Sequence, residues 1–129
     1  MIYTSYFAKL KDAKNPISVC GKAPDWYTGP QYKILAPKLW FFKEYKEGKI
    51  TAKEYTHYYY NEVLKPLDPK KVFEDLQHIY NQDDFTLICY EVPADFCHRH
   101  LISKWFELNG YSVKQERDSR SSEESSSRP

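Results

Sequence analysis

The sequence has little of what marks secreted, membrane-bound or nucleic-acid-binding proteins. It contains three cysteines and no C-x-x-C pair, so we expect no disulfide framework. No apolar run approaches the ~20 residues of a membrane span, and the N-terminus lacks the layout of a secretory signal. A net charge of +1 gives no strong overall field toward nucleic acid or acidic lipid. We therefore predict a cytoplasmic protein without membrane contact.

What the chain does have is enough apolar and aromatic material for one core. Its 129 residues are 41% hydrophobic and 17% aromatic, which suits a single ring-rich domain. The last thirteen residues contain six serines and no apolar side chain, so they cannot bury enough surface to offset their ordering entropy. We expect one domain over residues 1–116 and a disordered tail over 117–129. A role of this tail in partner binding is left open.

Four short runs are typical of β-strands, at residues 1–7, 16–20, 85–91 and 111–116. The third is nearly continuous apolar, as expected for a central parallel strand covered on both faces. A lysine-rich connector joins the first two. The pattern predicts an α/β fold with a small, mostly parallel sheet of about four strands and helices on both faces, in a Rossmann-like arrangement.

Helical patterns fill most of the remaining folded part, at residues 37–48, 51–68, 68–82 and 94–110. The second opens with a capping box of Thr51 and Glu54. The last is predicted to begin after an N-cap at Asp95 and to end near Gly110. The helices supply the crossovers that a parallel sheet requires.

Polar residues follow two of the predicted strands, and parallel sheets bind ligands beyond the carboxyl ends of their strands. Cys20 ends the second run and Glu91 ends the third, so we expect both to face one crevice. With Asp95 as N-cap, Cys97 lies in the first helical turn, where a thiol ionises more easily. We therefore predict Cys97 as the nucleophile, with Glu91 and His98 as acid–base or orienting groups.

The same helix start also suits an anion, because free backbone N–H groups and Arg99 would bind a phosphate or carboxylate. A structural alternative stays open, in which Cys97 is a buried packing residue and His98 and Arg99 hold the fold by hydrogen bonds. A zinc set of Cys20, Cys97 and His100 matches no standard finger spacing. We predict no metal site, and the sequence identifies no cofactor.

A long segment without clear secondary structure, residues 20–38, follows the second strand, and such loops are often functional. Rings and lysines together suit a nucleobase with phosphate, or single-stranded nucleic acid. The alternative is a loop folded over its own apolar side. The candidate ligand-binding residues in this segment are Cys20, Gly21, Lys22, Asp25, Trp26 and Lys38.

Three blocks carry a family resemblance: "IYTSYFAKLK", "ISVCGKAPDWYTGPQYKILAPK" and "LICYEVPADFCHRHLISKWFELNGY". They resemble the bacterial and phage family known as domain of unknown function 488, over essentially residues 1–116. The resemblance implies a compact α/β fold and no settled activity. The positions that match its motifs are Cys20, Gly21, Lys22, Pro24, Trp26, Glu91, Cys97, His98 and Arg99.

Taken together, the residues predict an enzyme or binder for a small anionic, nucleotide-like ligand at the carboxyl edge of the sheet, with Cys97 as a reactive thiol. The alternative is a non-catalytic module that binds a nucleotide or single-stranded nucleic acid in the same crevice.

Overall fold

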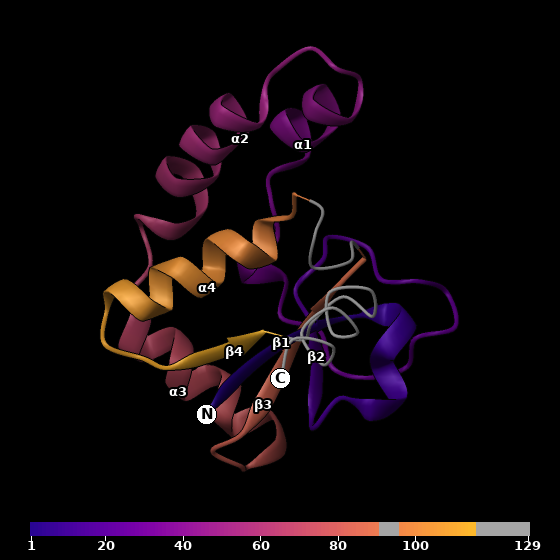
Figure 1. Cartoon of the computed structure of the whole chain (residues 1–129), viewed down its shortest axis with the longest axis vertical. Coiled ribbons are helices and arrows are strands. Elements are labelled where there is room, and N and C mark those ends of the chain that lie inside the picture. The colour runs from indigo at the N-terminus through magenta and orange to yellow at the C-terminus, as the bar shows by residue number, and fades with distance from the viewer. Residues whose placement is uncertain (91–95, 116–129) are drawn as a thin grey trace, which may run out of the picture.

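The computed structural model describes residues 1–90 and 96–115 (Figure 1). Its elements in chain order are strand β1 (Ile2–Tyr6), 3-10 helix η1 (Phe7–Asp12), strand β2 (Pro16–Ser18), 3-10 helix η2 (Lys33–Leu35), helices α1 (Leu39–Lys46) and α2 (Ala52–Tyr59), the π-helical turn η3 (Tyr60–Leu64), helix α3 (Pro69–Tyr80), strand β3 (Phe85–Cys89), helix α4 (His98–Leu108) and strand β4 (Val113–Gln115).

The four strands form one parallel sheet in the order β2-β3-β1-β4. The longest pairing joins β1 to β3, from Ile2 opposite Phe85 to Tyr6 opposite Cys89. All of β3 is buried, as its continuous apolar sequence predicts. The predicted small parallel α/β sheet is confirmed.

The two faces of the sheet are covered differently. On one face the ring of Phe73 in α3 contacts that of Phe85, with centroids 5.6 Å apart. On the other, Thr86 donates to the carbonyl oxygen of Lys14, just after η1, at 2.6 Å. The connection from β1 to β2 runs in the opposite direction to that from β3 to β4, and right-handed crossovers place such connections on opposite faces. Helices α3 and α4 therefore lie on one side and the short η1 on the other (Figure 1).

Local signals fix most helix ends where the sequence predicts them. Thr51 and Glu54 form the predicted capping box, with bonds of 3.1 and 2.9 Å. Gly48 and Gly110, with φ of +75° and +91°, follow α1 and α4, in the left-handed conformation that glycine adopts without strain.

The start of α4 differs from the prediction. The helix begins at His98, and Cys97 takes the N-cap position with extended backbone, so the expected cap at Asp95 is wrong. The reason is tertiary, because the side chain of Cys97 reaches to Cys89 at the end of β3. Asp95 itself, Glu91 and the predicted tail 117–129 lie outside the described residues.

The helices in the described part of the chain are all too short or too polar to cross a membrane.

Candidate functional site

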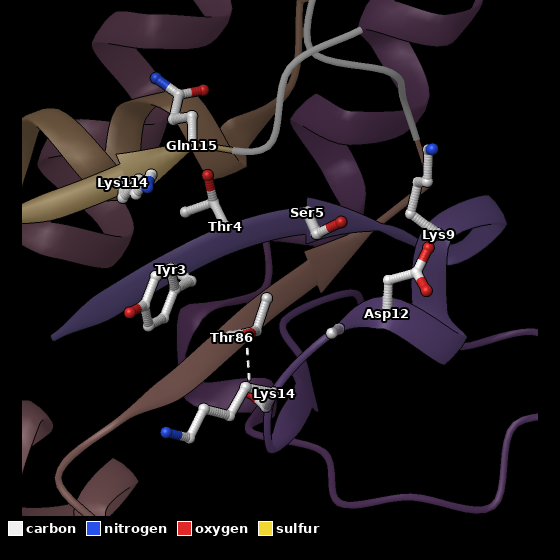
Figure 2. Close-up of a pocket in the computed structure, with 10 residues that line it drawn as sticks. Tyr3, Thr4, Ser5, Lys9, Asp12, Lys14, Thr86, Lys114 and Gln115 are labelled. Carbon is white, nitrogen blue, oxygen red and sulfur yellow. Dashed lines mark hydrogen bonds between the residues drawn. The ribbon is translucent and has the colours of Figure 1, made fainter. Parts of the chain in front are cut away.

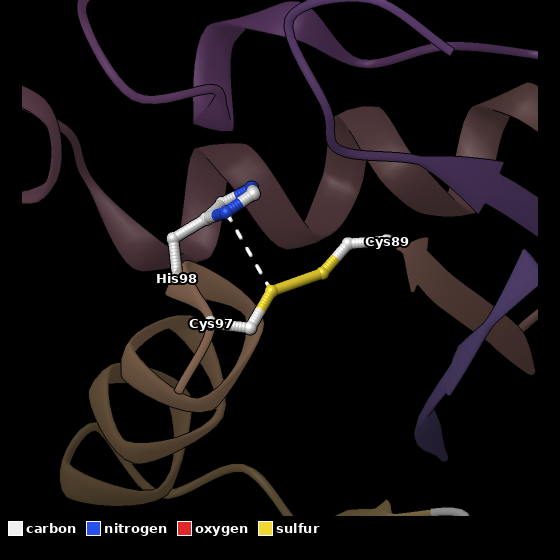
Figure 3. Close-up of side chains that lie close together, drawn as sticks. All are labelled: Cys89, Cys97 and His98. Carbon is white, nitrogen blue, oxygen red and sulfur yellow. Dashed lines mark hydrogen bonds between the residues drawn. A yellow bond between two sulfur atoms is a disulfide. The ribbon is translucent and has the colours of Figure 1, made fainter. Parts of the chain in front are cut away.

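Cys89 and Cys97 meet at the end of β3 and form a disulfide (Figure 3). Both are buried, with exposed fractions of 0% and 4%. The prediction of no disulfide was therefore wrong, because the pairing depends on a strand end and a helix start converging in space. A disulfide sulfur is not a thiolate. The nucleophilic role predicted for Cys97 is thus a prediction for the reduced chain.

His98 joins this pair to the neighbouring strand β2. Its Nε2 lies 2.8 Å from the carbonyl oxygen of Val19, and its Nδ1 lies 3.8 Å from Cys97 Sγ. Its ring packs on that of Tyr59, with centroids 5.6 Å apart. The residues that follow β2 and the start of α4 thus contact each other. This contact is packed and buried at Val19, Cys97 and His98, where a crevice was expected.

Cys20 and Arg99 are buried at the same edge of the sheet. Cys20 Sγ lies 4.0 Å from the carbonyl oxygen of Ile88. Arg99 is 1% exposed, and its Nη1 donates to the carbonyl oxygen of Ser5 at 2.6 Å. These contacts fit the structural alternative, in which this block holds strand ends together. A ligand contact by Arg99 stays a prediction.

The segment 20–38 packs through its tyrosines. The hydroxyl of Tyr27 donates to the carbonyl oxygen of Pro30 at 2.7 Å, and burial raises the pKa of Tyr27 to about 12. The hydroxyl of Tyr32 donates to Asp75 at 2.7 Å. The loop therefore packs against the protein itself at both Tyr27 and Tyr32.

The candidate ligand residues of this loop face solvent: Gly21, Lys22, Asp25 and Trp26 are all exposed. Trp26, at 61% exposure, contacts the ring of Phe7 with centroids 5.9 Å apart. The hydroxyl of Tyr90 donates to the carbonyl oxygen of Lys22 at 2.8 Å. Both contacts place the loop beside the carboxyl ends of β1 and β3.

Lys38 is separate from the other predicted residues. It precedes α1 and lines a cavity of about 460 Å³ with Lys33 and Glu62. Cys97 lines a different and much smaller cavity. The structure therefore does not bring Lys38 and Cys97 to one site.

A further cavity, of about 330 Å³, lies beside β1 (Figure 2). Its size falls in the range of small-molecule sites, roughly 300–1,000 Å³. Its lining comes from β1, from η1 and the residues after it, from the start of β3 and from β4, and most of the lining side chains are hydroxyl-bearing or basic. This cavity is the strongest candidate for a ligand site.

Three lysines and one aspartate line this cavity. The Nζ of Lys14 lies 3.1 Å from Asp84, which also binds the N-terminal ammonium of Met1 at 2.8 Å. These two hydrogen-bonded cations lower the pKa of the Asp84 carboxyl. Within residues 1–90 and 96–115, Lys9 and Lys114 form no salt bridge. The excess of ammonium over carboxylate groups favours an anionic ligand.

Thr4 also lines this cavity, but its hydroxyl lies on the other side of β1 from Tyr3, Thr86 and Lys14 (Figure 2). Thr4 is 2% exposed, and its Oγ1 has no hydrogen-bond partner in the described part of the chain. Figure 2 shows this oxygen on the side of β1 that faces Gln115 of β4. A buried polar atom without a partner costs roughly 1–3 kcal/mol.

The cavity also adjoins the place where parallel sheets bind ligands. The chain leaves β1 toward β2 and leaves β3 toward β4, so the switch point lies between β1 and β3. Ser5, near the carboxyl end of β1, lines the cavity. The rest of the lining extends along β1 to Tyr3 and to Thr86 at the start of β3, so this cavity is not the crevice predicted after β2 and β3.

The family model DUF488-N3a, described as the active DUF488-N3 subclade, matches residues 6–110. No curated protein and no solved structure matches the chain. Lys9 and Lys14 lie inside the matched range, whereas Thr4 and Lys114 lie outside it.

Proposed function

We propose that this chain, which belongs to the DUF488 family, binds a small phosphorylated ligand of the nucleotide class in the cavity beside β1. The observation that carries this proposal is one cavity of about 330 Å³ that is lined by Lys9, Lys14 and Lys114. The lysines come from η1, from the residues after it and from β4.

The lining offers partners for each part of such a ligand. Ammonium groups form strong, charge-assisted hydrogen bonds with phosphate oxygens. The half-buried ring of Tyr3 supplies an aromatic surface on which a base can stack. Asp12 adds carboxylate oxygens that can accept hydrogen bonds from sugar hydroxyls or an exocyclic amine. A nucleotide uses all three kinds of contact, whereas a bare anion uses the lysines alone.

A reaction at this site is favoured over binding alone by one observation, since the matched subclade is described as active. The reactive thiol predicted at Cys97 belongs to this proposal in its reduced form. The alternative is a module that binds the ligand without turnover. Following the family resemblance, we place this function in the cytoplasm of a bacterium or in phage-infected cells.

Isothermal titration calorimetry with AMP, ADP and pyrophosphate tests the binding proposal. We expect Lys9→Ala and Lys114→Ala each to weaken binding of the phosphorylated probes about tenfold, because one charge-assisted hydrogen bond is lost. Lys53→Ala, an exposed lysine on α2, is the matched control and should bind like the parent chain. Absence of binding, or equal affinity in all variants, would contradict the proposal.

Turnover is tested by following the bound nucleotide by ³¹P NMR and chromatography under reducing conditions. Conversion that is lost in Lys114→Ala but kept in Lys53→Ala supports an enzyme. Tight binding with an unchanged nucleotide supports the non-catalytic module.

A further inference from the structure

Three buried side chains at the end of β3 carry the ligand atoms of a metal site. Sulfur atoms of Cys89 and Cys97 and a ring nitrogen of His98 all lie within 4.8 Å of one another. Figure 3 shows the imidazole turned toward the two sulfurs. This set differs from that of Cys20, Cys97 and His100, which the sequence did not favour, since His100 Nδ1 lies 2.8 Å from Gln115 Oε1.

The tautomer of His98 is set by its contact with β2. Nε2 lies 2.8 Å from the carbonyl oxygen of Val19, and a carbonyl can only accept, so Nε2 carries the proton. In the neutral ring the lone pair is then on Nδ1, which faces Cys97 Sγ at 3.8 Å. Metal-bound histidines are held in this way, with the second ring N–H donated to a backbone carbonyl.

The spacing of the two cysteines fits a bridging ion. Their Cα atoms lie 7.8 Å apart, whereas disulfides usually span roughly 4.4–6.8 Å. Two Zn–S bonds of roughly 2.3 Å at a tetrahedral angle hold the sulfurs about 3.8 Å apart. A directly bonded pair holds them roughly 2.05 Å apart. The wider backbone spacing therefore favours an ion between the sulfurs.

We propose that the reduced chain binds Zn²⁺ through Cys89 Sγ, Cys97 Sγ and His98 Nδ1. Two thiolates and one imidazole form a ligand set that zinc prefers. The fourth position faces a cavity of about 10 Å³ beside Cys97 and His98, among the rings of Tyr55 and Phe96. That volume is about the minimum for one water, and a water completes the tetrahedron. The ion joins the end of β3 to the start of α4 and, through His98, to β2.

The electron and proton balance is simple. A thiol reductant transfers two electrons and two protons to the Cys89–Cys97 disulfide and yields two thiols. Zinc binding then releases those two protons, because thiolates are the ligands. The disulfide and the zinc site are therefore two alternative states of the same pair of sulfurs. This proposal is independent of the lysine-lined cavity.

Metal analysis of the full chain, purified with a phosphine reductant and dialysed against Zn²⁺, tests the site. We expect about one zinc per chain, released as a mercurial reagent titrates two thiols. Replacement by Co²⁺ should give the visible spectrum of tetrahedral cobalt with thiolate-to-cobalt charge transfer. Both readouts use the unmodified sequence and do not depend on how a variant folds.

Variants identify the ligands. Cys89→Ser, Cys97→Ser and His98→Gln should each lose bound zinc, whereas Cys20→Ser and His100→Gln should keep it. Circular dichroism confirms that each variant is folded. A fully reduced parent chain that binds no zinc, or zinc binding that survives Cys97→Ser and His98→Gln, would overturn the proposal. So would loss of zinc in Cys20→Ser equal to that in Cys89→Ser.

Discussion

The cysteine–histidine cluster and the lysine-lined cavity lie near the same edge of the sheet, yet they are built in opposite ways. In the cluster, Cys89, Cys97 and His98 are buried and held by specific contacts to β2 and to one another. In the cavity, Lys9 and Lys114 line a space of about 330 Å³ and form no salt bridge within the described residues. The first region holds secondary-structure elements together, and the second is the one for which we propose a ligand.

The difference shows that a conspicuous sequence motif and the candidate binding site can lie in different parts of the fold. Residues with reactive side chains are conspicuous in a sequence. In the fold, these side chains are buried and already bonded to one another or to the backbone. A cavity made of lysines, threonines and a tyrosine has no unusual residue type. It is recognised by the space it encloses and by the charged side chains that line it. Substitutions in the first region should therefore act on stability, and those in the second on ligand binding.

The largest effect on stability is expected for His98→Ala. The variant removes the hydrogen bond to Val19 and the packing on Tyr59, so the free energy of unfolding should fall by about 3 kcal/mol. Urea denaturation measures this loss. His100→Ala is the matched control, because its half-buried ring bonds to exposed Gln115, and its loss should stay below about 1 kcal/mol. Equal losses of unfolding free energy in His98→Ala and His100→Ala would contradict a larger structural role for the buried cluster.

Tyr59→Phe should have the next largest effect. The buried hydroxyl of Tyr59 donates to the carbonyl oxygen of Leu35 at 2.6 Å, and its removal leaves a buried acceptor unpaired. We expect a loss of about 1–2 kcal/mol in the free energy of unfolding. Tyr60→Phe, on an exposed ring of the same helical segment, should change it by less than about 0.5 kcal/mol. A neutral Tyr59→Phe would show that this hydrogen bond contributes nothing.

Thr4→Val sharpens the comparison because it should change stability and leave ligand binding unchanged. Valine keeps the shape of threonine and removes the buried hydroxyl, which has no partner in the described part of the chain. The free energy of unfolding should rise by up to about 1 kcal/mol, while the affinity for AMP stays that of the parent chain. Thermal denaturation and calorimetry on the same sample measure both. A destabilised Thr4→Val chain would mean that the hydroxyl is already satisfied within the fold.

The smallest effect is expected for Asp84→Asn. The N-terminal ammonium and Lys14 lower the folded-state pKa of Asp84, so its stabilising effect is present above the unfolded pKa of about 3.9 and is lost as pH falls through the lowered folded value. The parent chain should be slightly more stable than Asp84→Asn at pH 7. The difference should vanish in strong acid.

Glu107→Gln, on an exposed face of α4, is the control for this pH series and should show no such dependence. A difference in stability between the parent chain and Asp84→Asn that persists unchanged at low pH would show that it does not arise from the charge of Asp84.

Much of the fold could be predicted from local patterns. The apolar run of β3 predicts a central parallel strand, and Thr51 with Glu54 predicts the start of α2, because both signals depend on near neighbours. The start of α4 could not be predicted in this way. An aspartate favours an N-cap by its own chemistry, but the contact of Cys97 with Cys89 decides where the helix begins.

None of the predicted site residues that the structure describes lines the candidate cavity. The lysine-rich connector was visible in the sequence, although nothing in it indicated a cavity. Lys114 reaches the site because β4 pairs in parallel with β1, which places it opposite Tyr3. Such long-range pairing is set by the whole sheet and leaves no trace in local spacing. Cys97 stands out in the sequence by residue type, but its environment is a property of the folded chain.

The most direct test of the account is a titration of the ¹⁵N-labelled, full-length chain with AMP, followed by amide chemical shifts. The account predicts saturable shifts that centre on Thr4, Ser5, Lys9 and Lys114, and shifts in Lys114→Ala that need about tenfold more AMP to reach saturation. Shifts confined to residues 20–26 and to the start of α4, with the amides of Thr4 and Lys9 unmoved, would contradict it.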